Sequence, residues 1–518
     1  MESTIIEKIK KEIENFDLTS KEENIGRVVS VGDGVAEIEG LSDVKMGEMV
    51  LFDNSQNKSL KEAIDKDNDL YGMVLNLEED SVKVIILGDV SFVYESMLVK
   101  STGRVLSVPV SDEIIGRVVN TMAEPIDGKG AIKADKYMPV ERDAYGVIDR
   151  KSVDTPLHTG IKAIDTMVPI GRGQRELIIG DRFTGKTTVA IDTIINQKHE
   201  PENERPICVY VSVGQKEAKT ALIVAELQKQ GAMDYTIVVD AGASTTAAMQ
   251  FLAPYAGVAI AEYFMEKGRD VLIIYDDLSK QAVAYRQVSL LLRRPPGREA
   301  YPGDIFYLHS RLLERSAKLS DAKGGGSITA LPIIETQEGD VSAYIPTNVI
   351  SITDGQIALD SSLFNKGIRP AIDVGNSVSR VGSAAQTKAI KSVGGGLRIE
   401  LAQFRELEAF MQFAQDLDEA TKKRIDKGQR MVELLKQQKG SPMPFEVQTV
   451  SIYAGMNDLY KNVDVDKISE TEKKWVDYID AEHKDILDDI RSSKKLSDET
   501  TKKLDEAMNS FKKLIENK

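Results

Sequence analysis

The stretch ELIIGDRFTGKTTVAIDTIIN, residues 176–196, carries the strongest local signal in the sequence. Its loop has the pattern Gly, four residues, Gly-Lys-Thr, and stands between an apolar strand-like run and a helix-like run. Glycines let main-chain amides approach a phosphate, the helix N-terminus adds partial positive charge, and the lysine reaches the terminal phosphates. The pattern predicts binding of ATP or ADP with Mg²⁺. The candidate phosphate-binding residues are Gly180, Asp181, Arg182, Phe183, Thr184, Gly185, Lys186, Thr187 and Thr188.

Around this loop, strand-like runs alternate with helical stretches from residue 101 to residue 386. Alternation of this kind predicts a mostly parallel sheet covered on both faces, an α/β P-loop (RecA-like) nucleotide-binding domain. The runs that we expect to be its strands are 176–179, 207–213, 236–239 and 271–275.

The segments on either side of residues 101–386 have different patterns of apolar and polar residues. Short β-rich runs at 27–31, 35–38, 48–52 and 82–87 predict an N-terminal β-barrel or sandwich over residues 24–100. Residues 387–518 lack strand runs, and helical periods at 397–415 and 479–490 predict an α-helical domain. Residues 1–23 have the pattern of one amphipathic helix, either packed on its own domain or docked on a partner. The polar stretch 53–69 is expected to be an exposed loop.

The composition excludes several classes of protein. A net charge of −15, from 67 basic and 82 acidic residues, opposes non-specific binding to nucleic acid or anionic lipid. The single cysteine, Cys208, lies in an apolar run, which predicts a buried thiol and excludes a disulfide framework. The charged N-terminus has no secretory pattern, and no run approaches the length of a membrane span. We therefore expect a cytosolic protein, or one that partners hold at a membrane.

Two further positions bear on the chemistry of the loop. The run 271–275 leads into Asp276, which we expect to hold Mg²⁺ together with Thr187, directly or through water. Asp276 could instead cap a helix that begins at Leu278. The run 207–213 leads to Gln215, where many ATPases have a carboxylate that activates water. An amide cannot act as a base near neutral pH, so Gln215 is either an ordinary polar strand end or a sign of nucleotide binding without turnover.

Five longer stretches extend the pattern along the sequence. They are PIGRGQRELIIGDR at 169–182, DDLSKQAVAYR at 276–286, LLLRRPPGREAYPGD at 290–304, YIPTNVISITDGQ at 344–356 and SVSRVGSAAQ at 377–386. With these stretches in this order, the chain resembles the alpha subunits of F-type rotary ATP synthases along nearly its whole length.

The resemblance implies a place in a complex. In that family, three alpha and three beta subunits alternate in a hexameric ring around a central stalk gamma subunit, and a peripheral stalk or delta subunit contacts the ring. The ring lies at the cytoplasmic face of the cell membrane as a peripheral part of a proton-translocating ATP synthase. Catalysis occurs on beta, while alpha binds nucleotide in a non-catalytic, regulatory site.

The resemblance also assigns roles to individual residues. Arg380 matches an arginine finger that acts in trans on the neighbouring beta subunit, and a guanidinium suits the charge that develops during phosphoryl transfer. Ser351 matches a position at the same interface, although a serine at a strand-edge turn would look alike. Arg369, Pro370 and Gln437 match the lining of the adenine pocket.

Departures from the family pattern leave other functions open. Phe183 and Lys439 stand where alpha subunits have glutamine, and the stretch 53–69 is longer than usual. One alternative is an alpha-like subunit of a specialised rotary ATPase that is not coupled to proton transport. Another is a catalytic RNA-dependent ring helicase, against which the acidic charge and Gln215 both argue.

Overall fold

The computed structural model describes residues 24–53, 70–411 and 418–516. Its internal contacts divide the protein into two compact units. The helix expected over residues 1–23 and nearly all of the polar stretch 53–69 lie outside the described residues. None of the described helices is both long and apolar enough to cross a bilayer.

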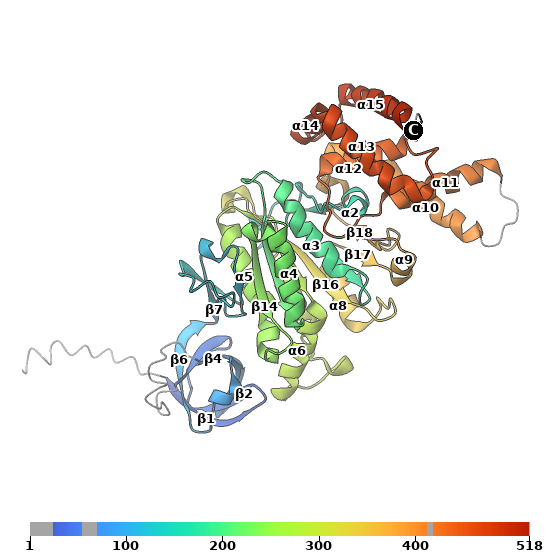
Figure 1. Cartoon of the computed structure of the whole chain (residues 1–518). Helices are drawn as coiled ribbons and strands as arrows, with labels where there is room; N and C mark the ends of the chain where they lie inside the picture. Colours follow the sequence, from blue (N-terminus) through green and yellow to red (C-terminus); the bar gives the residue numbers. More distant parts are fainter. Residues whose placement is uncertain (1–23, 54–69, 412–417, 517–518) are drawn as a thin grey trace, which may run out of the picture. The chain divides into compact units, whose positions relative to one another are not determined.

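The first unit contains a closed barrel of six antiparallel strands in the order β1-β2-β5-β4-β3-β6 (Figure 1). Its strands are β1 (Ile25–Gly32), β2 (Val35–Glu39), β3 (Glu48–Asp53), β4 (Leu70–Leu77), β5 (Ser81–Leu87) and β6 (Leu98–Val105). Alternate side chains such as Ala36, Ile38, Val50 and Val84 point inward and are buried, as the interior of a small barrel requires. A barrel, one of the two predicted forms, is therefore confirmed.

Two barrel strands were absent from the prediction for identifiable reasons. β4 has five of its eight residues buried, four of them consecutive, so its sequence does not alternate between apolar and polar letters. β6 is mostly polar in its second half and continues five residues past Lys100.

The second unit contains an eight-stranded sheet in the order β18-β17-β12-β16-β15-β13-β14-β8. All neighbouring strands are parallel except the edge pair β17 and β18. The strands are β8 (Val118–Val119), β12 (Leu177–Gly180), β13 (Ile207–Val213), β14 (Thr236–Ala241), β15 (Asp270–Asp276), β16 (Ser327–Glu335), β17 (Gly355–Leu359) and β18 (Val378–Ser379). Short strand pairs outside this sheet are β7 (Ser107–Val110) with β9 (Lys136–Pro139), and β10 (Pro156–Leu157) with β11 (Ile170–Gly171).

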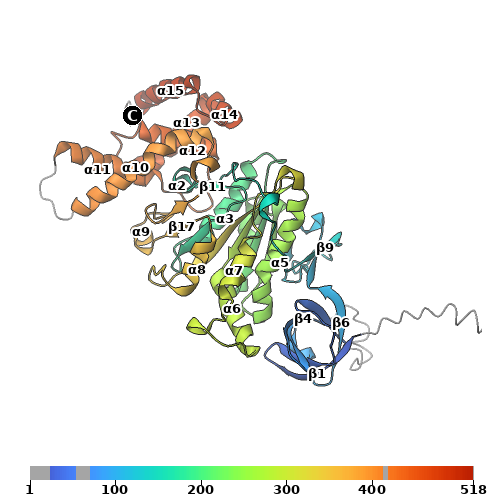
Figure 2. The ribbon, with the colours of Figure 1, turned by 180° about the vertical axis from the view of Figure 1, so that it is seen from behind.

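Helices cover both faces of this sheet, as the alternating pattern predicts. Figure 1 shows α3 and α4 on one face, and Figure 2, from behind, shows α5 and α7 on the other. The helices of this region are α2 (Lys162–Met167), α3 (Lys186–Asn196), α4 (Glu217–Lys229), α5 (Ala247–Glu266), α6 (Leu278–Leu291), α7 (Ile305–Leu313), α8 (Tyr344–Ile352) and α9 (Ser361–Asn365). Cys208, on the interior strand β13, is fully buried as predicted, and burial raises the pKa of its thiol above the usual range.

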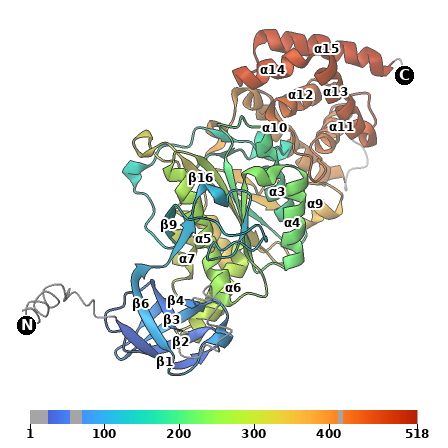
Figure 3. The same ribbon diagram turned by 60° about the vertical axis from the view of Figure 1, so that its left-hand side comes forward.

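The C-terminal part of the protein is helical (Figure 3), and its described residues contain no strand. Its helices are α10 (Lys388–Met411), α11 (Glu419–Leu434), α12 (Phe445–Met456), α13 (Ile468–Glu482), α14 (Lys484–Ser493) and α15 (Asp498–Glu516). The period expected over 479–490 spans two helices, because the backbone at His483 (φ −137°, ψ 37°) interrupts it. One apolar core runs without a break from Ile178 in the sheet to Trp475 in α13, so these helices pack on the nucleotide-binding domain.

Candidate functional site

The loop between β12 and α3 has the backbone that a phosphate cradle requires. β12 ends at Gly180 and α3 begins at Lys186, so the loop joins the carboxyl edge of the sheet to a helix N-terminus. Gly185 precedes the helix with a φ of +103°, a left-handed conformation that glycine adopts without steric cost. Phe183 also has a positive φ, +63°, and is 89% exposed. The loop therefore presents an aromatic ring to solvent.

Side chains from neighbouring strands and helices fix the loop. The Asp181 carboxylate accepts hydrogen bonds from the hydroxyls of Thr336 (2.6 Å) and Ser361 (2.9 Å), which follow β16 and begin α9. Arg182 is largely exposed and pairs with Glu335 at the end of β16, with 2.5 Å between Nε and Oε1. The loop is thus tied to both strands that flank β12.

Lys186 lies against the inside of the loop. Its Nζ donates hydrogen bonds to the carbonyl oxygens of Gly180 (2.8 Å) and Asp181 (2.5 Å). Burial lowers the pKa of its ammonium, and the carboxylates of Glu335 and Asp277 oppose that shift. An ammonium on flexible methylenes can leave carbonyl partners for a bound phosphate, which accepts stronger, charge-assisted hydrogen bonds.

A compact polar cluster lies beside the loop around Asp276 at the end of β15. The Asp276 carboxylate accepts hydrogen bonds from Thr187 Oγ1 (2.8 Å), Tyr210 Oη (2.7 Å) and Gln215 Nε2 (2.9 Å). The structure thus brings together Thr187, Gln215 and Asp276, three residues singled out from the sequence. Tyr210 was not among them, since nothing in a buried tyrosine of an apolar strand marks it as a partner of Asp276.

Lys219, from the first turn of α4, completes this cluster and was also not foreseen. Its Nζ lies 3.1 Å from Thr187 Oγ1, 3.2 Å from Gln215 Oε1 and 3.4 Å from Asp276 Oδ2. Its spacing of four residues from Gln215 gives no signal, because Gln215 and Lys216 precede the first residue of α4.

The capping role considered for Asp276 belongs to its neighbour. Asp277 Oδ1 accepts a hydrogen bond from the amide of Lys280 (2.8 Å) in the first turn of α6. Burial raises the pKa of the Asp277 carboxyl to about 6, and the nearby Lys280 opposes that shift. Asp276 is consequently directed toward the phosphate loop and not toward α6.

The oxygens of the cluster suit Mg²⁺. Thr187 Oγ1 and Asp276 Oδ2 are hard donors only 2.8 Å apart, next to the helix N-terminus where phosphates bind. The described residues contain no group of three or more His, Cys, Asp or Glu that could hold a metal alone. A hydroxyl and one carboxylate beside phosphate oxygens is the kind of set that binds Mg²⁺ as a nucleotide complex.

A cavity of about 560 Å³ extends from the loop toward the helical region. Among its lining residues are Thr184, Gly185 and Thr188 from the loop and α3, and Arg369, Pro370 and Gln437 from elsewhere in the sequence. Its size suits a nucleotide-sized ligand. The structure therefore places the residues expected at the adenine side in one cavity with the phosphate loop.

Two of these adenine-side residues are firmly positioned. Gln437 donates from Nε2 to the carbonyl of Gly160 (2.9 Å) and accepts at Oε1 from the amide of Lys162 (2.7 Å). Arg369 places its guanidinium 4.3 Å from the ring centroid of Phe364, and both residues line the cavity. Lys439, one of the departures from the family pattern, also lines the cavity.

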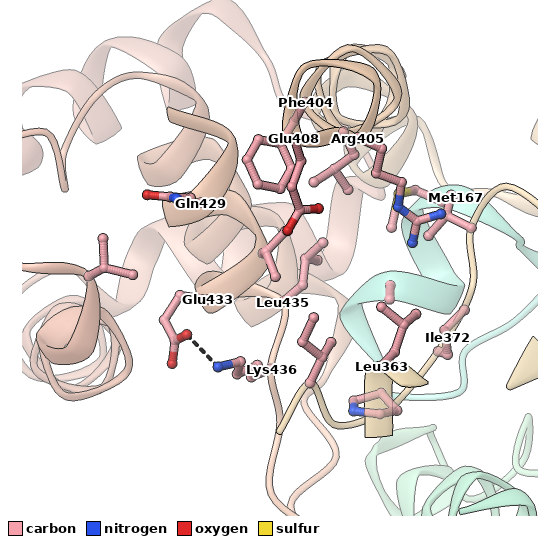
Figure 4. Close-up of a pocket in the computed structure, with 17 residues that line it drawn as sticks. Met167, Leu363, Ile372, Phe404, Arg405, Glu408, Gln429, Glu433, Leu435 and Lys436 are labelled. Carbon is pink, nitrogen blue, oxygen red and sulfur yellow. Dashed lines mark ion pairs between the residues drawn. The ribbon is translucent and has the colours of Figure 1, made fainter. Parts of the chain in front are cut away.

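A second cavity, of about 400 Å³, adjoins the first and shares Pro370, Glu433 and Lys436 with it. Figure 4 shows Phe404 and Leu435 among its apolar walls, with a Glu433–Lys436 ion pair of 2.5 Å at one side. No residue of the phosphate loop lines it. The first cavity is therefore the candidate nucleotide site.

Arg380 stands apart from this site. It follows the edge strand β18, its amide donates to the carbonyl of Asp354 (2.9 Å), and its side chain is exposed. Within the part of the protein that the structure describes, its guanidinium makes no hydrogen bond or ion pair. Ser351 is exposed in the last turn of α8, and its hydroxyl donates a hydrogen bond to the carbonyl oxygen of Asn348 (2.7 Å). The turn at a strand edge suggested for Ser351 is wrong, because the helix continues through it.

Comparison with known proteins agrees with this architecture. Three family models match: the beta-barrel domain of the ATP synthase alpha/beta family over residues 22–103, the nucleotide-binding domain of that family over 160–379, and the C-terminal domain of the ATP synthase alpha and beta subunits over 386–511. The chain belongs to the ATP synthase alpha/beta family. Within that family it is similar to the ATP synthase subunit alpha of Sulfurovum sp. (strain NBC37-1), with 56% identity over 504 residues that cover 97% of this chain and 96% of the relative.

Proposed function

We propose that this chain is the alpha-type subunit of an F-type rotary ATP synthase, which binds nucleotide in a regulatory site and does not hydrolyse it. The observation that carries the second half of this proposal is Gln215. It follows strand β13 and hydrogen-bonds Asp276, whose carboxylate also accepts from Thr187 of α3. An amide there cannot take a proton from water, so the site holds nucleotide without a general base.

The residues around the loop divide the binding of nucleotide among them. Lys186 and the amides of the loop would hold the phosphates, and Thr187 and Asp276 would hold Mg²⁺, the latter directly or through water. Bound Mg²⁺ would supply positive charge to the phosphate oxygens. Thr188, Arg369, Pro370 and Gln437 line the space for the base and sugar.

Arg380 serves a different site, on the neighbouring subunit. Its exposure at the sheet edge and the lack of a bond to its guanidinium among the described residues support this role. A charged planar fork aimed at a neighbour's nucleotide stabilises the charge on the transferring phosphoryl group. Ser351, exposed at the end of α8, would lie in the same interface.

Membership of the family supports a proposal for the assembly. Three copies of this subunit alternate with three beta subunits in a ring of six, around a gamma subunit, and the ring contacts a peripheral stalk or delta subunit. The complex lies at the cytoplasmic face of the cell membrane. We take residues 24–100 as the barrel domain, 101–386 as the nucleotide-binding domain and 387–518 as the helical domain, with 1–23 as a separate N-terminal helix.

The composition of the native complex tests this proposal. Purified without crosslinking, the complex should contain this subunit and a beta-type subunit in a ratio of three to three, with nucleotide bound to this subunit. A ring built from six copies of this subunit would overturn the proposal, because each copy would then need a general base of its own.

A further inference from the structure

The ammonium of Lys219 lies where a cation would be expected beside the phosphates. Its three nearest oxygens are Thr187 Oγ1, Gln215 Oε1 and Asp276 Oδ2, at 3.1, 3.2 and 3.4 Å. Thr187 and Asp276 are the same donors that suit Mg²⁺. Since an ammonium has three protons, one position satisfies all three acceptors at once.

The position of the Lys219 side chain is fixed by its contact with a buried carboxylate. Its side chain is 41% exposed, whereas that of Asp276 is 3% exposed, so the lysine reaches from the surface onto a buried carboxylate. Asp276 in turn is fixed by Tyr210 and Gln215. A buried carboxylate with several hydrogen bonds is a stable anchor for a single compact cation.

Lys219 and Mg²⁺ cannot share this position. Mg²⁺ binds its oxygens at about 2.0–2.1 Å in octahedral geometry, which leaves no room for an ammonium between the same two side chains. Two cations at close range also repel each other. Binding of Mg²⁺ must therefore displace Lys219, whereas a nucleotide that arrives without Mg²⁺ finds Lys186 and Lys219 together at the phosphate end.

From this geometry we propose that Lys219 is a tethered cation that competes with Mg²⁺, so that nucleotide binding by this protein depends only weakly on the metal. The proposal rests on the nucleotide-binding function proposed above and specifies which form of the nucleotide that site accepts. It also makes Lys219 a specificity-determining residue, which bridges Asp276 and the incoming phosphates in place of the metal.

Binding of ATP by the purified full-length protein tests the proposal. The dissociation constant is measured by calorimetry with excess Mg²⁺ and again with EDTA, for the wild type and for Lys219→Ala. We expect the two constants of the wild type to agree within about threefold. In Lys219→Ala, affinity in EDTA should fall about tenfold, as the loss of a charged hydrogen bond implies, and affinity with Mg²⁺ should not fall.

Two variants serve as controls. Lys216→Ala removes the same charge three residues earlier, from an exposed side chain, and should behave as the wild type. Lys219→Arg keeps the charge and should retain the weak dependence on Mg²⁺. A second measurement follows Mn²⁺ by electron paramagnetic resonance: its affinity for the protein with ATP bound should rise in Lys219→Ala, because the competing ammonium is gone.

The outcomes separate this proposal from the function on which it rests. Equal loss of affinity with and without Mg²⁺ in Lys219→Ala, or no loss in either, would overturn the role of Lys219 and leave the nucleotide site standing. Absence of ATP binding by the wild type under both conditions would overturn the nucleotide site itself, and the role of Lys219 with it.

Discussion

The cluster around Asp276 and the edge that carries Arg380 belong to one sheet but differ in how their polar groups are satisfied. At Asp276, near the middle of the sheet, four side chains hydrogen-bond one carboxylate. At Arg380, on the edge, the guanidinium is exposed and makes no bond within the described residues. A closed cluster is arranged to hold a ligand in place, whereas an exposed guanidinium without a hydrogen bond among the described residues is available to a neighbour. On the function proposed above, the difference corresponds to nucleotide binding in cis at Asp276 and catalysis in trans at Arg380.

The largest effect, on ATP turnover, should come from Arg380 at the edge of the sheet. In the assembled ring, Arg380→Ala should lower ATP turnover by about 10³ to 10⁵, the range for loss of an arginine finger, without loss of assembly. The matched control is Arg424→Ala, an exposed arginine on α11, which should leave turnover unchanged. Turnover and the mass of the complex are measured together. A ring that turns over normally without the Arg380 guanidinium would remove the distinction between the two regions.

The next effect should be on stability and should come from beneath the nucleotide cavity. Lys162 is fully buried, and its backbone amide donates a hydrogen bond to Gln437. Its ammonium forms an ion pair with Glu472 of α13. Glu472→Ala leaves that charge uncompensated, which costs about 3–5 kcal/mol and should lower the melting temperature of the protein by several degrees. Glu470→Ala on the same helix breaks only an exposed pair with Lys474 and should leave the melting temperature nearly unchanged. Equal melting temperatures for the two variants would contradict this.

A smaller effect is expected on affinity. Lys186→Ala in the full-length protein should weaken ATP binding about 10- to 100-fold, since it removes charged hydrogen bonds to phosphate. Lys198, exposed just past the far end of α3, provides the control, and Lys198→Ala should bind as the wild type. Calorimetry on both variants gives the comparison. Unchanged affinity in Lys186→Ala would mean that the loop does not hold the phosphates.

The smallest effect should be a dependence of the protein's stability on pH, which arises from Asp192 in the wall of the cavity. Burial raises the pKa of Asp192 to about 6, and the amide of Gly440 donates to its Oδ1 (3.0 Å). The folded state therefore binds this proton more tightly than the unfolded state, and stability falls as pH rises from about 4 to about 6. Asp192→Asn imitates the protonated form and should stabilise the protein by about 1–2 kcal/mol above pH 7.

Thermal melting of the wild type and Asp192→Asn across this range checks the prediction. The advantage of the variant should vanish below about pH 4, where both states of the wild type hold the proton. A constant difference in melting temperature between pH 4 and pH 8 would show that Asp192 does not titrate in this way.

Much of this arrangement follows from sequence because its signals are local. Residues adjacent in the sequence define the loop from Gly180 to Thr187 and the buried strand that ends at Asp276. The same is true of the helices that follow each strand. Lys219 and Tyr210 could not be predicted from such local patterns. They approach Asp276 only because β13, which carries Tyr210 and leads into α4 with Lys219, pairs in parallel with β15. The break at His483 was missed because apolar spacing continues across it. The turn considered as an alternative for Ser351 was wrong, because the turn residues Thr353, Asp354 and Gly355 begin just after the helix.

The division between binding in cis and catalysis in trans is tested most directly by one measurement of turnover. Rings that carry Arg380→Ala and rings that carry Lys186→Ala are assayed for kcat side by side, with assembly verified in both. We predict a loss of about 10³ to 10⁵ for Arg380→Ala. For Lys186→Ala we predict a loss of less than about tenfold, because the phosphates that Lys186 contacts are not cleaved. A loss for Lys186→Ala that equals or exceeds the loss for Arg380→Ala would show that this subunit's own site is catalytic.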